Sequence, residues 1–128
     1  MLISDNKRIV EIQREFQQMF PFLKLEFYTS AHGEGEGSPK KAMLSAQKTV
    51  GETRKVHVEG EMRISPEMSV ETLERRFFEF FGLNAQVFRR SGNLWLQTTA
   101  TDHWTLAEQN RKGGASAEHF EEMHAPEI

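Results

Sequence analysis

Two stretches of the sequence carry large apolar residues at three- and four-residue spacing, which is typical of a helix with one buried face. The first stretch ends before Pro21, which cannot continue a helix. The second ends at Gly82, a residue suited to the left-handed conformation at a helix end. The apolar positions are Ile9, Ile12, Phe16, Met19 and Phe20 in the first predicted helix, and Val70, Leu73, Phe77, Phe80 and Phe81 in the second.

Other stretches alternate apolar and polar residues, which predicts half-buried strands. Leu23, Leu25 and Phe27 alternate with polar neighbours just after the first helix. Residues 56–64 show the same alternation before the second helix, and residues 85–88 follow it. The sequence Ser91-Gly92-Asn93 predicts a tight turn, with residues 93–99 as the partner strand of a hairpin.

The chain contains an internal repeat, because segments 1–30 and 62–91 align without gaps. MLIS aligns with MRIS, and Phe16 and Phe20 fall on Phe77 and Phe81. Each copy predicts a strand, a helix and a strand. The predicted fold class is therefore α+β: a ferredoxin-like two-layer sandwich of two βαβ units, with an extra C-terminal strand and both helices on one face. A β-grasp-like fold or another small α+β sandwich is the alternative.

The length of 128 residues indicates one domain, which we place at residues 1–112. A segment rich in Gly, Ser, Pro and Lys begins near residue 31, and we predict a flexible insertion over residues 31–48. Thr105 and Glu108 fit a capping box that starts a short helix. That helix is expected to end near the glycine pair at 113, which leaves residues 113–128 as a disordered tail.

Composition removes several classes of function. Sixteen Lys and Arg against nineteen Asp and Glu give a net charge of −3, unlike a strongly basic nucleic-acid binder. The absence of Cys excludes thiolate metal sites and a cysteine nucleophile. No apolar run approaches a membrane span, and no secretory signal or common nucleotide motif is visible, so we expect a cytoplasmic protein without a cofactor.

His57, Glu59 and Glu61 are the metal-ligand candidates, since residues two apart share one face of a strand. His32, Glu34 and Glu36 repeat the same spacing. Carboxylates at this spacing are about 7 Å apart, which is wide for chelating one ion. We therefore predict a solvated strand face and no metal.

Asp102 and His103 stand beside threonine hydroxyls, and a catalytic interpretation makes His103 a base oriented by Asp102. Adjacent residues rarely orient each other in this way, so we predict no catalytic residue. A metal-dependent or acid–base enzyme is the third of three functional hypotheses.

The outer face of the predicted sheet combines basic and aromatic residues, which is how one class of RNA-binding module stacks bases. Tyr28, Arg90 and Trp95 are the main candidates on this face, while Glu26 opposes the binding of phosphate. Lys24, His57 and Arg63 are the other basic members. Single-stranded nucleic-acid binding is the second hypothesis.

Phe78 lies off the apolar face of the second helix, directly beside Phe77. Such an additional ring is typical of a protein contact. The equal alternative is that the segment 31–54 or a C-terminal helix folds over the ring and covers it. Because no catalytic motif accompanies it, the leading hypothesis is a small non-enzymatic protein-interaction module, with self-association as a homodimer.

The stretch GLNAQVFRRSGNLWLQTTATDHWTLAEQNRKG, residues 82–113, resembles an uncharacterised family of small soluble bacterial proteins. The resemblance covers about a quarter of the chain and concerns composition and order rather than chemistry. It implies a bacterial, cytoplasmic setting and brings no site residue or activity with it.

Overall fold

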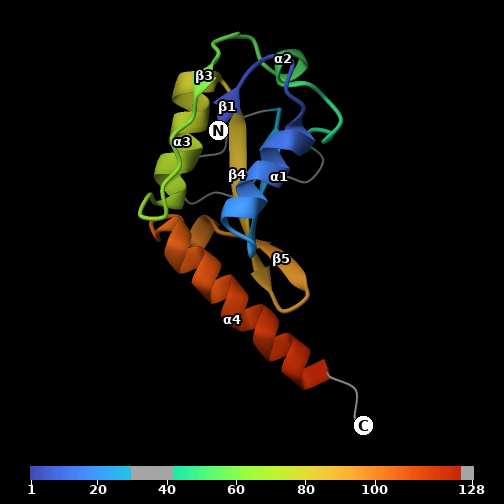
Figure 1. The fold of residues 1–128 in the computed structure, drawn as a ribbon, viewed down its shortest axis with the longest axis vertical. Coiled ribbons are helices and arrows are strands. Elements are labelled where there is room, and N and C mark those ends of the chain that lie inside the picture. Colours follow the sequence, from blue (N-terminus) through green and yellow to red (C-terminus); the bar gives the residue numbers. More distant parts are fainter. Residues whose placement is uncertain (30–41, 125–128) are drawn as a thin grey trace.

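The computed structural model describes residues 1–29 and 42–124, which form an α+β protein (Figure 1). The elements are β1 (Leu2–Ile3), α1 (Ile9–Met19), β2 (Leu23–Tyr28), α2 (Val50–Thr53), β3 (Gly60–Glu61), α3 (Val70–Phe81), β4 (Asn84–Ser91), β5 (Leu94–Gln97), the 3₁₀ helix η2 (Thr99–Thr101) and α4 (Leu106–His124).

Helices α1 and α3 confirm the two helices predicted from apolar spacing. The Ser69 hydroxyl accepts a hydrogen bond from the Thr72 N–H at 3.1 Å, which caps the start of α3. Gly82 follows its last turn with a φ of 66°. Met19 and Phe80, which the spacing placed on the buried faces, are instead exposed at the margins of the two helices.

The strands within residues 1–29 and 42–124 form two separate antiparallel sheets. β2, β4 and β5 lie side by side in that order, with Leu25 opposite Val87, while β1 pairs only with β3. The first strand of each half therefore lies in a different sheet from the second. A ferredoxin-like sandwich needs all of them in one sheet, and this topology is not clearly shown. The predicted strand over residues 56–64 is reduced to the two residues of β3.

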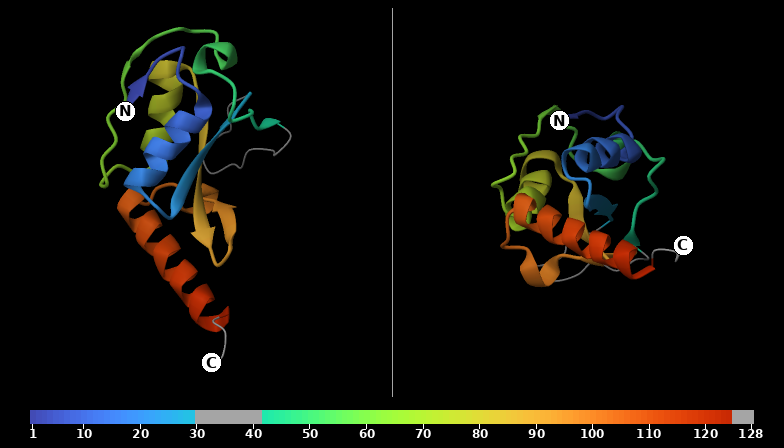
Figure 2. Two further views of the ribbon diagram at one scale, coloured as in Figure 1. Left: turned by 45° about the vertical axis from the view of Figure 1, so that its right-hand side comes forward. Right: turned by 60° about the horizontal axis from the view of Figure 1, so that its bottom comes forward.

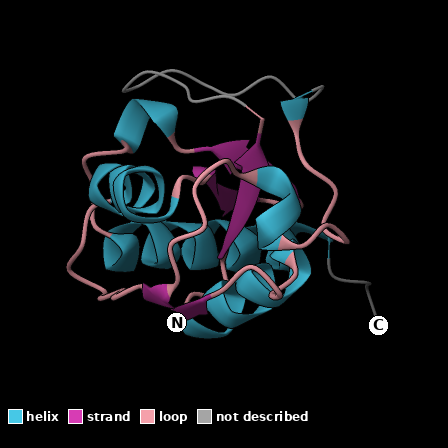
Figure 3. Ribbon diagram, turned by 90° about the horizontal axis from the view of Figure 1, so that it is seen from above, coloured by secondary structure: helices cyan, strands magenta, loops and turns pink. Residues whose placement is uncertain are grey.

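Helices α1 and α3 pack on one face of the sheet β2–β4–β5 (Figures 1 and 2). Phe27 of β2 meets Phe77 of α3 edge-on, with ring centroids 5.4 Å apart. The Gln13 amide of α1 donates to the Leu25 carbonyl at 2.8 Å. Figure 3 shows β1 and β3 near the N-terminus, apart from the larger sheet. The main core therefore lies between the helices and this sheet.

The same tight turn precedes each of the four α-helices in the described part of the chain. In every turn a backbone N–H donates to the carbonyl three residues earlier, at 2.9–3.2 Å. The donor and acceptor pairs are Lys7 and Ser4, Lys48 and Ser45, Met68 and Ser65, and Trp104 and Thr101. The turn is thus a recurring unit of the chain.

These turns also pair reciprocally, α1 with α2 and α3 with α4. The Ile9 N–H donates to the Lys48 carbonyl and the Val50 N–H to the Lys7 carbonyl, at 3.0 and 2.8 Å. The corresponding bonds of the other pair are Val70 to Trp104 at 3.1 Å and Leu106 to Met68 at 2.8 Å. Each half of the chain therefore includes a second helix start beyond segments 1–30 and 62–91.

The predicted insertion is only partly described, because residues 30–41 lie outside the described ranges. Residues 42–48 do not behave as a flexible insertion. Met43 forms a bridge with Tyr28, and the Leu44 N–H donates to the Phe27 carbonyl at 2.7 Å. This stretch therefore extends the edge of β2 and leads into the turn before α2.

Helix α4 corrects the expectation of a disordered tail over residues 113–128. It continues through Gly113 and Gly114 to His124, and residues 125–128 lie outside the described ranges. A side chain on Gly113 would meet the Phe22 backbone carbonyl at 3.0 Å, and one on Gly114 would meet the Phe22 ring at 3.0 Å. The two glycines allow the helix to approach Phe22, and this packing offsets a propensity cost of about 1 kcal/mol for each glycine.

Gly113→Val is expected to lower the free energy of unfolding by about 2–3 kcal/mol, because the added side chain forces α4 away from Phe22 and Arg89. Ala115→Val is the control, since Ala115 is exposed on the same helix, and we expect it to cost about 0.5 kcal/mol. Urea denaturation followed by circular dichroism measures both. Equal effects of the two substitutions would contradict close docking at Gly113.

Candidate functional site

Helix α3 exposes two phenylalanine rings. The side chains of Phe78 and Phe80 are each 54% exposed, while Phe77, directly before Phe78, is fully buried. Successive helical residues are rotated by about 100°, so Phe78 and Phe80 lie on opposite flanks of the helix. Half-exposed aromatic rings at a helix surface are typical of a protein contact.

A polar strip separates the two rings. Arg75 and Glu79 are both exposed and lie one turn apart, on the side of α3 that faces away from Phe77. The Arg75 guanidinium lies 3.8 Å from the Glu71 carboxylate on the same helix, and both side chains are accessible to solvent. This is a weak contact that solvent screens. The strip therefore presents charges of both signs between two apolar flanks.

Val56 adds an apolar side chain at the C-terminal end of α3. It is half-exposed and lies against Gly82, where any side chain would collide with it. We use the name α3 surface for Val56, Arg75, Phe78, Glu79 and Phe80. These residues come from two segments that are distant in the sequence, the middle and C-terminal part of α3 and the stretch before β3.

Arg54 anchors the segment that carries Val56. Its fully buried guanidinium donates to the Phe81 carbonyl at 2.9 Å and to the Asp5 carboxylate at 3.0 and 2.8 Å. These bonds hold the pKa of Asp5 below its usual range. The second carboxylate oxygen of Asp5 lies 2.8 Å from Nδ1 of His57. The network ties the N-terminal turn to the end of α3.

The three metal-ligand candidates each bind a different group of the N-terminal segment. His57 contacts the Asp5 carboxylate, Glu59 accepts from the Asp5 backbone N–H at 2.8 Å, and Glu61 accepts from the Met1 nitrogen at 3.1 Å. Within residues 1–29 and 42–124, no three His, Cys, Asp or Glu side chains are grouped to hold a metal ion. The parallel pattern of His32, Glu34 and Glu36 lies outside the described residues.

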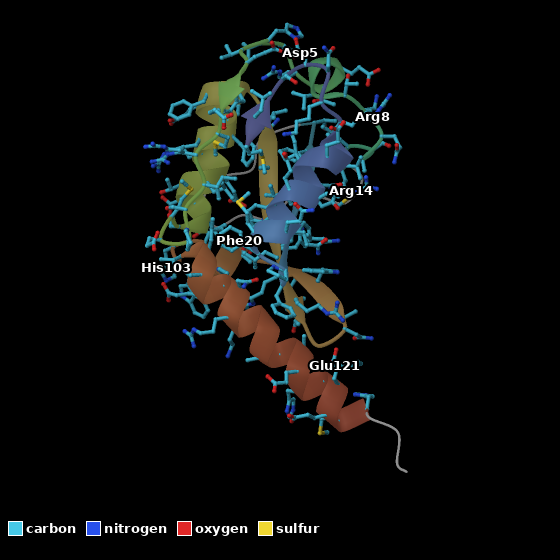
Figure 4. All side chains as sticks on the ribbon, viewed as in Figure 1. Asp5, Arg8, Arg14, Phe20, His103 and Glu121 are labelled. Carbon is cyan, nitrogen blue, oxygen red and sulfur yellow. The ribbon has the colours of Figure 1, made fainter. Side chains whose placement is uncertain are left out.

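His103 is exposed just before α4, and in Figure 4 it lies well below Asp5, which is near the top of the view. The backbone carbonyl of Asp102 accepts from the Glu71 N–H at 2.8 Å. The pair thus belongs to the turn that joins the starts of α3 and α4. His57 and His103 do not share a site.

The outer sheet face is only partly as predicted. Lys24 Nζ lies 5.3 Å from the Trp95 ring centroid, and the Arg90 guanidinium carbon lies 5.7 Å from the same centroid. Tyr28 is only 2% exposed, and burial raises its pKa to about 12. Tyr28 is therefore not available for stacking. His57 and Arg63 belong to the segment before α3 and do not join this face.

A shallow hollow of about 450 Å³ lies between α4 and the loop before β2. The exposed ring of Phe22 forms one wall, and the other walls come from one side of α4. Its lining includes Asn110, Arg111, Gly114 and Glu118. The Asn110 side chain accepts a hydrogen bond from the Phe22 N–H at 2.9 Å, so it is used in holding α4.

Sequence reasoning identified Phe78 but missed Phe80, Val56 and the anchor Arg54. Phe80 fits the apolar spacing of α3 and was therefore assigned to the core. Arg54 carries no local signal, because its partners Asp5 and Phe81 are distant in the sequence. Val56 was assigned to a strand that the structure limits to Gly60 and Glu61.

Neither protein-family models, nor curated proteins, nor solved structures match this chain. No helix among residues 1–29 and 42–124 is both long enough and apolar enough to cross a membrane.

Proposed function

We propose that this chain is a non-catalytic protein-interaction module that acts as a homodimer through the α3 surface. The observation that supports the proposal is the exposure of Phe78 and Phe80 on the two flanks of one helix. Burying such rings is the main favourable contribution at protein interfaces. We expect the module to act in the cytoplasm, in line with the absence of Cys.

The proposed partner is a second copy of the chain. The strip between the rings carries Arg75 and Glu79, so the surface has both charges and complements itself. A strictly acidic or basic surface would favour a partner of opposite charge. The α3 surface has neither bias.

Phe78→Asp is expected to abolish self-association, because it places a charge where a ring is buried in the dimer. Sedimentation equilibrium from about 10 μM to 1 mM measures the association, since an interface of this small size is weak. Leu94→Asp is the control, because Leu94 is equally exposed but lies on β5. A wild-type chain that remains monomeric at the highest concentration would refute the proposal.

A second candidate function, single-stranded nucleic-acid binding, is favoured by the position of Lys24 and Arg90 beside Trp95. Against it, Glu26 lies 3.9 Å from Lys24 on the same face. Titration of Trp104→Phe with mixed-sequence oligonucleotides at low salt isolates the fluorescence of Trp95. Unchanged fluorescence would remove this candidate, because phosphate attraction is strongest at low salt.

A further inference from the structure

We infer that two copies pack with their α3 helices antiparallel, so that Arg75 of each copy faces Glu79 of the other. The inference rests on the proposed homodimer and specifies its geometry. It names the two residues that determine which surface is recognised and in which orientation.

The spacing of the charges supports the antiparallel orientation. Arg75 and Glu79 are four residues apart, or about 6 Å along the axis, and Phe77 lies midway between them in the sequence. A two-fold axis at the level of Phe77 places position 75 opposite position 79 of the other copy. Two reciprocal ion pairs result. A parallel pair in the same register would place Arg75 against Arg75 and Glu79 against Glu79, which is repulsive.

The same register provides a partner for the exposed ring of Phe78. The two-fold axis brings the same flank of both helices together, so Phe78 of each copy lies beside Phe78 of the other across the interface. Contact between two aromatic rings is favourable beyond the apolar area that it buries. Phe80 on the other flank lies at the opposite margin, where it shields the ion pairs from solvent.

Both charges are available for these contacts. Among the described residues Glu79 forms no ion pair, and Arg75 has only the contact with Glu71 at 3.8 Å. Pairing with Glu79 of a second copy therefore does not require breaking a strong bond. Because α3 has twelve residues and is about 18 Å long, the contact is small and the dimer weak.

The test uses Arg75→Glu and Glu79→Arg, analysed separately and then mixed. Each single variant carries two like charges at every predicted contact with itself, so its self-association is expected to fall at least tenfold. In an equimolar mixture every contact is between opposite charges, and a heterodimer is expected with an affinity within about threefold of wild type. A rescue that depends on mixing cannot come from contacts within one helix.

Sedimentation velocity measures the heterodimer in the mixture of the two variants when one of them is fluorescently labelled. Arg14→Glu on the exposed side of α1 is the control for the change in net charge and is expected to leave self-association unchanged. A wild-type chain that stays monomeric would overturn the homodimer itself. A wild-type dimer whose charge variants neither weaken alone nor recover on mixing would overturn only the antiparallel register.

Discussion

Phe77→Ala is expected to lower the free energy of unfolding by about 3–5 kcal/mol. The ring is fully buried and meets Phe27 edge-on with centroids 5.4 Å apart, at an interplanar angle of 84°. Removing it leaves a cavity between α3 and β2 and also removes a favourable aromatic pair. Urea denaturation followed by circular dichroism measures the loss.

The adjacent Phe78 provides the matched control, because it has the same chemistry and the same helix. Its ring is 54% exposed, so Phe78→Ala is expected to change the stability of the monomer by no more than about 0.5 kcal/mol. The comparison must be made at low protein concentration, where self-association does not contribute. Similar losses for both substitutions would show that the two faces of α3 are assigned incorrectly.

Arg54→Met is expected to cost about 2–4 kcal/mol at neutral pH, because it removes charge-assisted hydrogen bonds from a buried position. The Phe81 carbonyl at the end of α3 loses its donor, and the Asp5 carboxylate loses the partner that lies 2.8 Å away. Methionine retains much of the apolar volume of the arginine stem. The decrease in the free energy of unfolding therefore comes from the lost hydrogen bonds rather than from a cavity.

The effect of Arg54→Met is expected to depend on pH with a defined sign. Arg54 holds the pKa of Asp5 below its usual range, so their interaction stabilises the fold fully above about pH 4. It is lost as the pH falls through the lowered pKa. The gap between wild type and Arg54→Met should therefore narrow on acidification from pH 7 to about pH 2.5, and Asp5→Asn should remove this part of the acid dependence. A constant gap would contradict the Asp5–Arg54 bond.

The local elements were largely predictable because their signals are local. Apolar spacing, Pro21 and Gly82 are sufficient to locate α1 and α3, and Ser91-Gly92-Asn93 to locate the hairpin of β4 and β5. Strand partners were not predictable in the same way. The pairing of β1 with β3 depends on contacts between residues about 60 positions apart. The alternation of apolar and polar residues predicts a strand but does not identify the strand that it pairs with.

The residues of the candidate site also differ in whether local sequence could predict their positions. Phe78 was identified because its position conflicts with the apolar face of its own helix. Tyr28, by contrast, was placed on an open sheet face and is buried, because alternation along a strand gives the face of a residue but not what covers that face. The proposed roles of Phe78, Arg75 and Glu79 remain predictions for the experiments above.

The sequence alone determined an α+β chain with two amphipathic helices, an internal repeat and a surplus phenylalanine, since each depends on spacing within about thirty residues. Only the tertiary structure decided that the strands form two sheets, that α4 continues through Gly113 and Gly114, and that Phe80 and Val56 join Phe78 at the surface. The physical reason is that burial and close approach depend on which distant segments meet. Phe22 meets the glycines of α4, and Arg54 meets Asp5 and Phe81, only in the folded chain.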